Sequence, residues 1–95
     1  MGNQYKQLEP AEVFSLLSDP TRISIFKTLL LEKEPCVSRI SEMTGVSLSA
    51  VSHQLKRLEL LGIISGCRYG QEICYCLNRD NRLTGQLIKL IKMIK

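Results

Sequence analysis

Apolar residues recur along the chain at two different spacings, and the change of spacing divides the sequence into helical and extended parts. Over residues 10–61 they return every three or four positions, the period of a helix with one buried face. Over residues 63–77 they alternate with polar or small residues, the period of a strand. From residue 79 to 95 the helical spacing returns. The pattern predicts four short helices, a β-hairpin and a last helix.

Proline and capping residues place the ends of the first two predicted helices. Pro10 suits a first helical position, and a helix of about two turns follows it to residue 17. Asp19 caps the next helix, with Pro20 at its first position. Apolar residues cover most of the circumference of this second helix, so we expect it to be central. It runs to about Lys33, and Pro35 stops it.

The next two predicted helices are joined by only four residues. The third covers about residues 38–44, with Ser38 as its cap and Gly45 at its end. Ser47 caps a fourth helix that runs to about Leu61. The connection TGVS between them has the length that a helix-turn-helix uses, so residues 38–61 are predicted to form one.

The alternating stretch at residues 63–77 is predicted to be the hairpin. A turn centred on Gly70 and Gln71 places Cys67 opposite Cys74 on the neighbouring strand. Cys74 and Cys76 then share one face of the second strand, because successive side chains alternate. The other face of that strand carries Ile73, Tyr75 and Leu77.

The last helix and the small size of the chain together favour a dimer. An apolar stripe runs along residues 79–95 and consists of Leu83, Leu87, Leu90, Ile91 and Ile94. A single domain of 95 residues buries only about 60–65% of its unfolded surface. We expect a partner subunit to cover the stripe that one such domain leaves open.

Composition indicates which kinds of partner the chain could bind and in which cellular compartment it is expected. Lys and Arg number 13 against 9 Asp and Glu, so the net charge of +4 mildly favours polyanionic partners. The chain has no apolar run long enough to cross a membrane and no apolar core of a signal peptide near its first residue. The last helix lacks an aromatic anchor for a membrane surface. We expect a cytoplasmic protein without a membrane partner, in which cysteines are thiols or ligands more often than structural disulfides.

The fourth predicted helix has two opposed faces. One face is apolar, with Val51, Leu55 and Leu58, and packs on the second and third helices. The other face is polar and carries Ser49, Ser52, His53 and Lys56, at helical spacings. Short donors and acceptors with one cation suit base edges and phosphates, and the helix N-terminus beside Ser47 favours a phosphate oxygen. The alternative from periodicity alone is a solvated polar face.

Three stretches of the chain carry a family resemblance: LSDPTRISIFKTLL, then VSRISEMTGVSLSAVSHQLKRLELLGII, then the strand end YCL. Together they resemble the arsenic-repressor (ArsR-type) family of winged helix-turn-helix regulators. The match covers roughly residues 9–78, and SAVSHQLKRL is its most specific part.

The resemblance implies a homodimer joined through the first and last helices, whose two fourth helices enter successive major grooves of double-stranded operator DNA. No cofactor is required for DNA binding. The family's DNA contacts carry over onto six positions here: Ser49, Ser52, His53, Gln54, Arg68 and Gln71. His53 is the only histidine and is expected to contact DNA rather than a metal, because it has no second histidine to pair with.

Many members of this family release DNA when they bind a metal or metalloid. Their best-known site begins the third helix with Glu-Leu-Cys-Val-Cys-Asp. This chain keeps Cys36 but has Ser38 and Arg39 in place of the second cysteine and the aspartate, so a two-thiolate site within the motif is absent. The family's other common site uses Asp and His pairs on the last helix, and residues 79–95 contain no histidine.

A different thiolate cluster is our hypothesis for the inducer site. In winged helices the stretch before the third helix pairs with the second wing strand, which brings Cys36 beside Cys74 or Cys76. A cluster drawn from Cys36, Cys67, Cys74 and Cys76 suits As(III) with three sulfurs, or Cd(II) or Zn(II) with four. Two alternatives stay open: the cysteines are ordinary small apolar residues, or they form a thiol redox switch with Cys67 and Cys74 as a possible pair.

The sequence therefore predicts a transcriptional repressor released from its operator by a metal or metalloid on cysteine thiolates. One alternative is a redox-responsive or ligand-independent regulator, and another is a winged-helix module that binds protein. An enzyme is not expected, because the chain has neither a glycine-rich phosphate loop nor a carboxylate partner for His53 on its own face.

Overall fold

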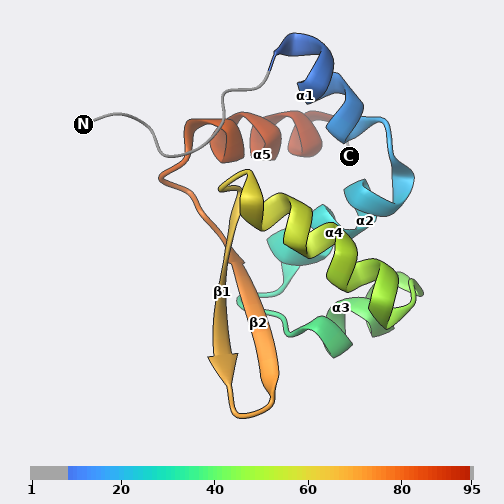
Figure 1. Cartoon of the computed structure of the whole chain (residues 1–95). Coiled ribbons are helices and arrows are strands. Elements are labelled where there is room, and N and C mark those ends of the chain that lie inside the picture. Colours follow the sequence, from blue (N-terminus) through green and yellow to red (C-terminus); the bar gives the residue numbers. More distant parts are fainter. Residues whose placement is uncertain (1–8, 95) are drawn as a thin grey trace.

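The computed structural model describes residues 9–94 and contains the predicted series of elements (Figure 1). In chain order these are α1 Pro10–Leu17, α2 Pro20–Leu31, α3 Val37–Thr44, α4 Leu48–Leu60, β1 Ile64–Tyr69, β2 Glu72–Leu77 and α5 Arg82–Ile94. The hairpin follows α4 and projects from the helices, so the fold is a winged helix-turn-helix, as predicted. None of the described helices is long and apolar enough to cross a membrane. Lys95, the last residue of the predicted final helix, lies outside the described residues.

The predicted helix caps are mostly confirmed. The Asp19 carboxylate accepts a hydrogen bond from the Thr21 backbone N–H at 2.9 Å. The Ser47 hydroxyl accepts one from the Ala50 N–H at 3.2 Å. Gly45 ends α3 with φ 74°, a left-handed conformation that glycine adopts without a steric cost. The turn between α3 and α4 is therefore specified by its own residues.

Three predicted boundaries are wrong. The last helix begins at Arg82 instead of residue 79, and the Asn81 side-chain oxygen just before it accepts the Leu83 N–H at 2.8 Å. The second helix ends at Leu31 instead of Lys33. The third begins at Val37 with Cys36 as its N-cap, instead of with Ser38. The Cys36 backbone is extended and its carbonyl accepts the Ile40 N–H at 3.0 Å, while the Ser38 hydroxyl donates to Glu72 at 3.3 Å. The helix starts earlier because the backbone before it pairs with the wing, a contact far away in sequence.

The core lies between α2, α3 and α4. Ile25 of α2 and Ile40 of α3 are fully buried, and the inner stripe of α4 joins them through Val51, Leu55 and Leu58. The predicted apolar face of α4 is confirmed. The opposite face of this helix is consequently left at the surface of the molecule.

The predicted stripe on α5 is only partly covered within its own subunit, because Leu83 and Leu90 are half-buried. Leu87 and Ile91 are buried, and both line a narrow space shared with Phe26 of α2. The large apolar side chains that remain exposed on α1 and α5 are Phe14 and Met93, at 70% and 77%. A dimer contact through α1 and α5 can therefore use Phe14 and Met93 together with the half-buried part of the stripe.

The wing has the predicted register, with Cys67 directly opposite Cys74. A short third segment joins the hairpin, because Cys36 forms a bridge with Cys74 and the Tyr75 N–H donates to the Pro35 carbonyl at 2.9 Å. Gly66 lies opposite Tyr75, whose ring is buried and lies over the glycine. The wing is thus attached to the segment that starts the helix-turn-helix.

Gly66→Ala is expected to destabilise the fold by about 1–3 kcal/mol, because the added Cβ would stand 2.9 Å from Cε1 of the buried Tyr75 ring. Gly85→Ala is the matched control, since its Cβ meets nothing within 4 Å and alanine favours a helix by up to about 1 kcal/mol. Urea unfolding of both variants measures the difference. Equal stabilities would show that Tyr75 does not need the space above Gly66.

Candidate nucleic-acid interface

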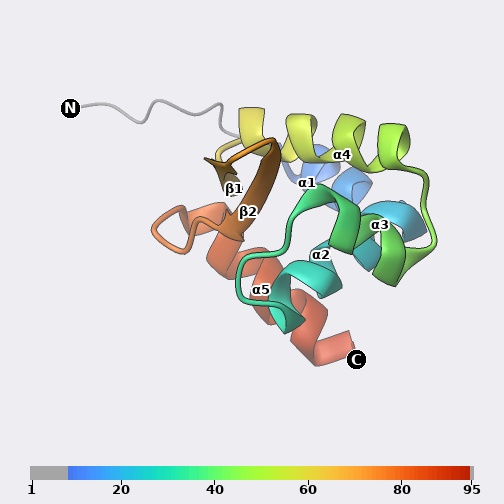
Figure 2. The same ribbon diagram turned by 90° about the horizontal axis from the view of Figure 1, so that it is seen from below.

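The outer face of α4 is open along its length. Figure 2 shows α4 along one edge of the molecule, with the other labelled elements on one side of it. The predicted contact residues Ser47, Ser49, Ser52, His53 and Lys56 are all exposed there. The structure brings them together on one surface, as the helical spacing predicted.

The charge on this surface is positive at the middle and end of the helix. Lys56 and Arg57 are both exposed on α4, whereas Arg39 on α3 is already paired with Glu32 and Glu42 at 3.3 and 3.1 Å. The hydrogen bond to Glu42, and after it the one to Glu32, raises the pKa of the Arg39 guanidinium. The free cations suited to phosphate therefore lie on α4 and not on α3.

Gln54 lies differently from its neighbours, and its placement does not support the predicted base contact. Its amide oxygen accepts a hydrogen bond from Arg22 Nε at 3.1 Å, and its amide nitrogen donates to Asp19 at 3.5 Å. Arg22 also pairs with Asp19 and donates to the carbonyls at the end of α1. Gln54 is half-buried and ties α4 to the start of α2. This network fixes the angle of α4.

The wing tip carries the other predicted DNA-contact residues, Arg68 and Gln71. Arg68 and Gln71 are exposed on either side of the turn, where Gly70 has φ 63°. Between them the Tyr69 hydroxyl donates to the Glu34 carboxylate at 3.2 Å, and this hydrogen bond is the main cause that raises the pKa of Tyr69. The tip is therefore anchored through Tyr69, while the side chains of Arg68 and Gln71 stay exposed.

Two exposed residues of α4 were missed by the sequence analysis. Leu48, the first residue of the helix, is 55% exposed although it is large and apolar. An apolar side chain at this end suits the methyl group of thymine. Arg57 adds a second cation beside Lys56. Leu48 keeps the helical spacing of Val51 and Leu55, so periodicity gave no signal that its side chain would be exposed.

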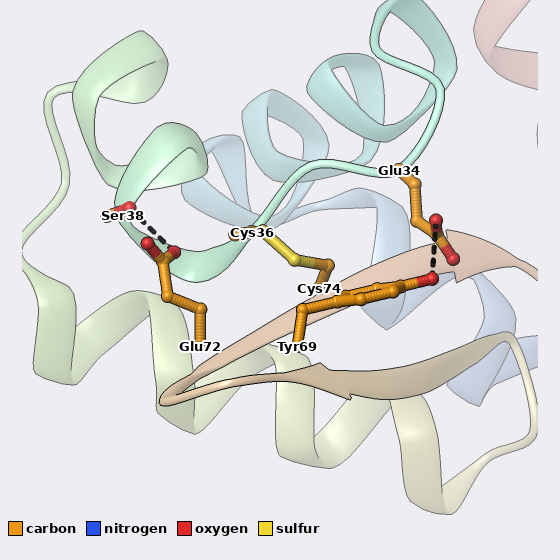
Figure 3. The surroundings of a disulfide bond; sticks show 6 residues. All are labelled: Glu34, Cys36, Ser38, Tyr69, Glu72 and Cys74. Atoms are coloured by element: carbon orange, nitrogen blue, oxygen red, sulfur yellow. Dashed lines mark hydrogen bonds between the residues drawn. A yellow bond between two sulfur atoms is a disulfide. The ribbon is translucent and has the colours of Figure 1, made fainter.

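Two of the four cysteines in the predicted thiolate cluster are bonded to each other. Cys36 and Cys74 form a disulfide (Figure 3), whereas the sequence favoured thiols or ligands. Cys67 is free and exposed, and Cys76 is free and half-buried. Among residues 9–94, no group of three or more His, Cys, Asp or Glu side chains is placed to hold a metal ion. A soft ion would require the disulfide to be reduced first, because a disulfide sulfur is no longer a thiolate.

Helix α4 is capped by Ser47, has an open polar face and is followed by an exposed hairpin. This arrangement defines the winged helix-turn-helix class of DNA-binding domains. A family model described as "Bacterial regulatory protein, arsR family" matches residues 19–65. The transcriptional repressor SdpR of Bacillus subtilis is 39% identical over 66 residues, which cover 70% of this chain and 72% of that protein. The chain belongs to the ArsR family.

Two further comparisons support the family assignment. The cadmium resistance transcriptional regulatory protein CadC homolog of Staphylococcus aureus is 35% identical over 78% of this chain and 61% of its own length. A homodimeric winged helix-turn-helix DNA-binding domain from Mycobacterium bovis, a possible ArsR-family regulator, superposes with a TM-score of 0.71 and 26% identity. That match covers 88% of this chain and 75% of the other. The chain spans between 54% and 61% of the length of three curated relatives.

Gln54→Ala is expected to lower the free energy of unfolding by about 1–2 kcal/mol, because it removes hydrogen bonds to the charged, half-buried Arg22 and Asp19. Ser52→Ala, on the exposed face of the same helix, should stay within about 0.5 kcal/mol of the parent. Chemical denaturation of both variants checks this. A Gln54 variant as stable as the Ser52 variant would contradict the positioning role.

Proposed function

We propose that this chain is a transcriptional repressor that binds a specific operator through α4 and the wing. The main support is that α4 has one buried and one exposed face. Its apolar stripe lies in the core, which leaves Ser49, Ser52 and His53 together at the surface. A helix of this kind enters the major groove and reads base edges by hydrogen bonds. Arg68 and Gln71 on the wing then contact the flanking backbone or minor groove.

The repressor acts as a homodimer on a palindromic site. Phe14 on α1 and Met93 on α5 are large apolar side chains that stay exposed, and they lie on the helices that the family resemblance assigns to the dimer. The Mycobacterium bovis domain that superposes on this chain is homodimeric. A two-fold dimer places two α4 helices in successive major grooves about one helical turn apart.

Substitutions on α4 should separate base reading from phosphate binding. His53→Ala and Ser52→Ala are expected to cost about 1–3 kcal/mol on a selected operator duplex and much less on random DNA, because they remove base contacts. Lys56→Ala should weaken both and lower the slope of log affinity against log salt by about one, because it removes one phosphate contact.

Lys89→Ala is the charge-matched control, since Lys89 is exposed on α5, at the opposite edge of the molecule from α4 in Figure 2. Fluorescence anisotropy over a range of salt concentrations gives all four affinities. If the Lys89 variant is still a dimer and loses as much affinity as the Lys56 variant, α4 is not the DNA-binding face.

Release by a soft metal or metalloid is the finer proposal. It is supported by the row of Cys67, Cys74 and Cys36 on three adjacent strand segments, and by the name of the CadC homolog, a cadmium resistance regulator. Cys76 follows Cys74 on the same face of β2. In the reduced chain these thiolates suit As(III), Cd(II) or Zn(II). No metal is needed for DNA binding itself.

Titrating the reduced protein with arsenite or cadmium is expected to produce a sulfur-to-metal absorption band and to lower operator affinity at least tenfold. The same titration of the oxidised protein is the control and should give a much weaker band, because only Cys67 and Cys76 then remain as thiols. Reduced protein without a band, and with unchanged operator affinity, would rule out the metal site.

A further inference from the structure

The Cys36–Cys74 disulfide joins two parts of the molecule that face DNA separately. Cys36 is the N-cap of α3, the first helix of the helix-turn-helix, and Cys74 lies in the middle of β2. The two residues are 38 positions apart in sequence. The disulfide therefore links the wing covalently to the helix pair that carries α4.

The backbone explains why these two cysteines meet. Cys36 and Cys74 are partners in an antiparallel bridge, and the Tyr75 N–H donates to Pro35 O beside the pair. A pair that flanks such a hydrogen bond is the non-hydrogen-bonded type, in which opposed side chains approach most closely. Cys74 is only 3% exposed and Cys36 is half-buried. Packing thus holds the two sulfurs together.

The side-chain links beside the disulfide are weaker. Tyr69 donates to Glu34 at 3.2 Å, and Ser38 donates to Glu72 at 3.3 Å (Figure 3). Both hydrogen bonds are exposed, where water competes for the same groups. Their wing residues, Tyr69 and Glu72, are the neighbours of the tip residues Arg68 and Gln71. Without the disulfide, the base of the wing stays packed on the core through Ile64 and Tyr75, but the tip is linked to the segment around α3 only by these two exposed hydrogen bonds and the Tyr75 backbone contact.

We propose that the Cys36–Cys74 disulfide is a reversible redox link that fixes the wing for operator binding, so that the oxidised chain binds its operator more tightly than the reduced chain. This inference rests on the proposed DNA-binding function, and it adds control of operator affinity by oxidation of Cys36 and Cys74. Fixing a binding element in advance improves affinity, because less conformational freedom is lost on binding. A disulfide in a DNA-binding protein of a reducing compartment is expected to be transient and regulatory.

The oxidant that completes the chemistry is a low-molecular-weight disulfide. Cys36, the more exposed of the two cysteines, loses its proton to solvent, attacks one sulfur of that disulfide, forms a mixed disulfide and releases one thiolate. Cys74 then loses its proton to solvent and attacks the Cys36 sulfur, which expels the second thiolate. Two electrons pass from the two cysteines to the external disulfide, and an excess of free thiol reverses both steps.

This assignment differs from the redox pair that the sequence suggested. Cys67 lies opposite Cys74 in the hairpin, but it is free and exposed while Cys74 is bonded to Cys36. A bond between Cys67 and Cys74 would only join the two strands of the wing. Cys67→Ser is therefore a matched control that removes a thiol from the same row and leaves the link intact.

The test compares the full chain with its Cys36→Ser, Cys74→Ser and Cys67→Ser variants, each reduced with a phosphine or oxidised with glutathione disulfide. The DNA probe is a duplex selected from a random library with the parent chain, and anisotropy gives the affinities. Oxidation is expected to tighten binding by the parent and by Cys67→Ser about tenfold and to slow amide exchange in β1 and β2. Cys36→Ser and Cys74→Ser should behave like the reduced parent in both conditions.

Equal affinity in the two states, weaker binding after oxidation, or loss of the response in Cys67→Ser would each overturn the redox link. If neither the oxidised nor the reduced chain binds any duplex, the proposed DNA-binding function is wrong, and so is the proposal that the disulfide strengthens operator binding. That outcome is distinct from equal, salt-dependent binding in both states, which leaves the repressor proposal in place and removes only the link.

Discussion

The burial of one face of α4 is the interaction on which the rest of the structure depends. Val51, Leu55 and Leu58 are fully enclosed, and each such side chain contributes about 1.5–3 kcal/mol relative to an exposed one. Because they fix the rotation of the helix about its axis, they also fix which residues face outward. The Arg22 and Gln54 hydrogen bond adds a polar tie to α2. Binding chemistry on α4 is thus a consequence of core packing.

The second constraint is the pairing of the segment before α3 with the wing. This segment gives the hairpin a third partner through Pro35 and Cys36, and it gives α3 its N-cap. A disulfide that closes a loop of 38 residues is worth about 4 kcal/mol in the chain-entropy account. The same contact therefore sets the start of the helix-turn-helix and the position of the wing. It is also the place where oxidation could alter both.

Local rules were sufficient to predict most of the fold from the sequence. The caps at Asp19 and Ser47, the end of α3 at Gly45 and the hairpin register each depend on residues close together in the chain, and all are confirmed. The errors come from long-range contacts. Gln54 lies on the flank of α4 between its polar face and its apolar stripe, and periodicity could not show its hydrogen bond to Arg22, 32 positions away. Cys36 becomes a cap because a strand from the wing pairs with it. Periodicity places a residue on a face but does not say what lies against that face.

In the proposed complex, the outer face of α4 and the tip of the wing contact DNA together. Mapping amide chemical shifts of the isotope-labelled chain, with and without a selected operator duplex, tests it most directly. We predict that the largest changes fall at residues 47–57 and 68–71 and that α5 changes little. Changes centred on α5, or on α4 without the wing, would contradict the account.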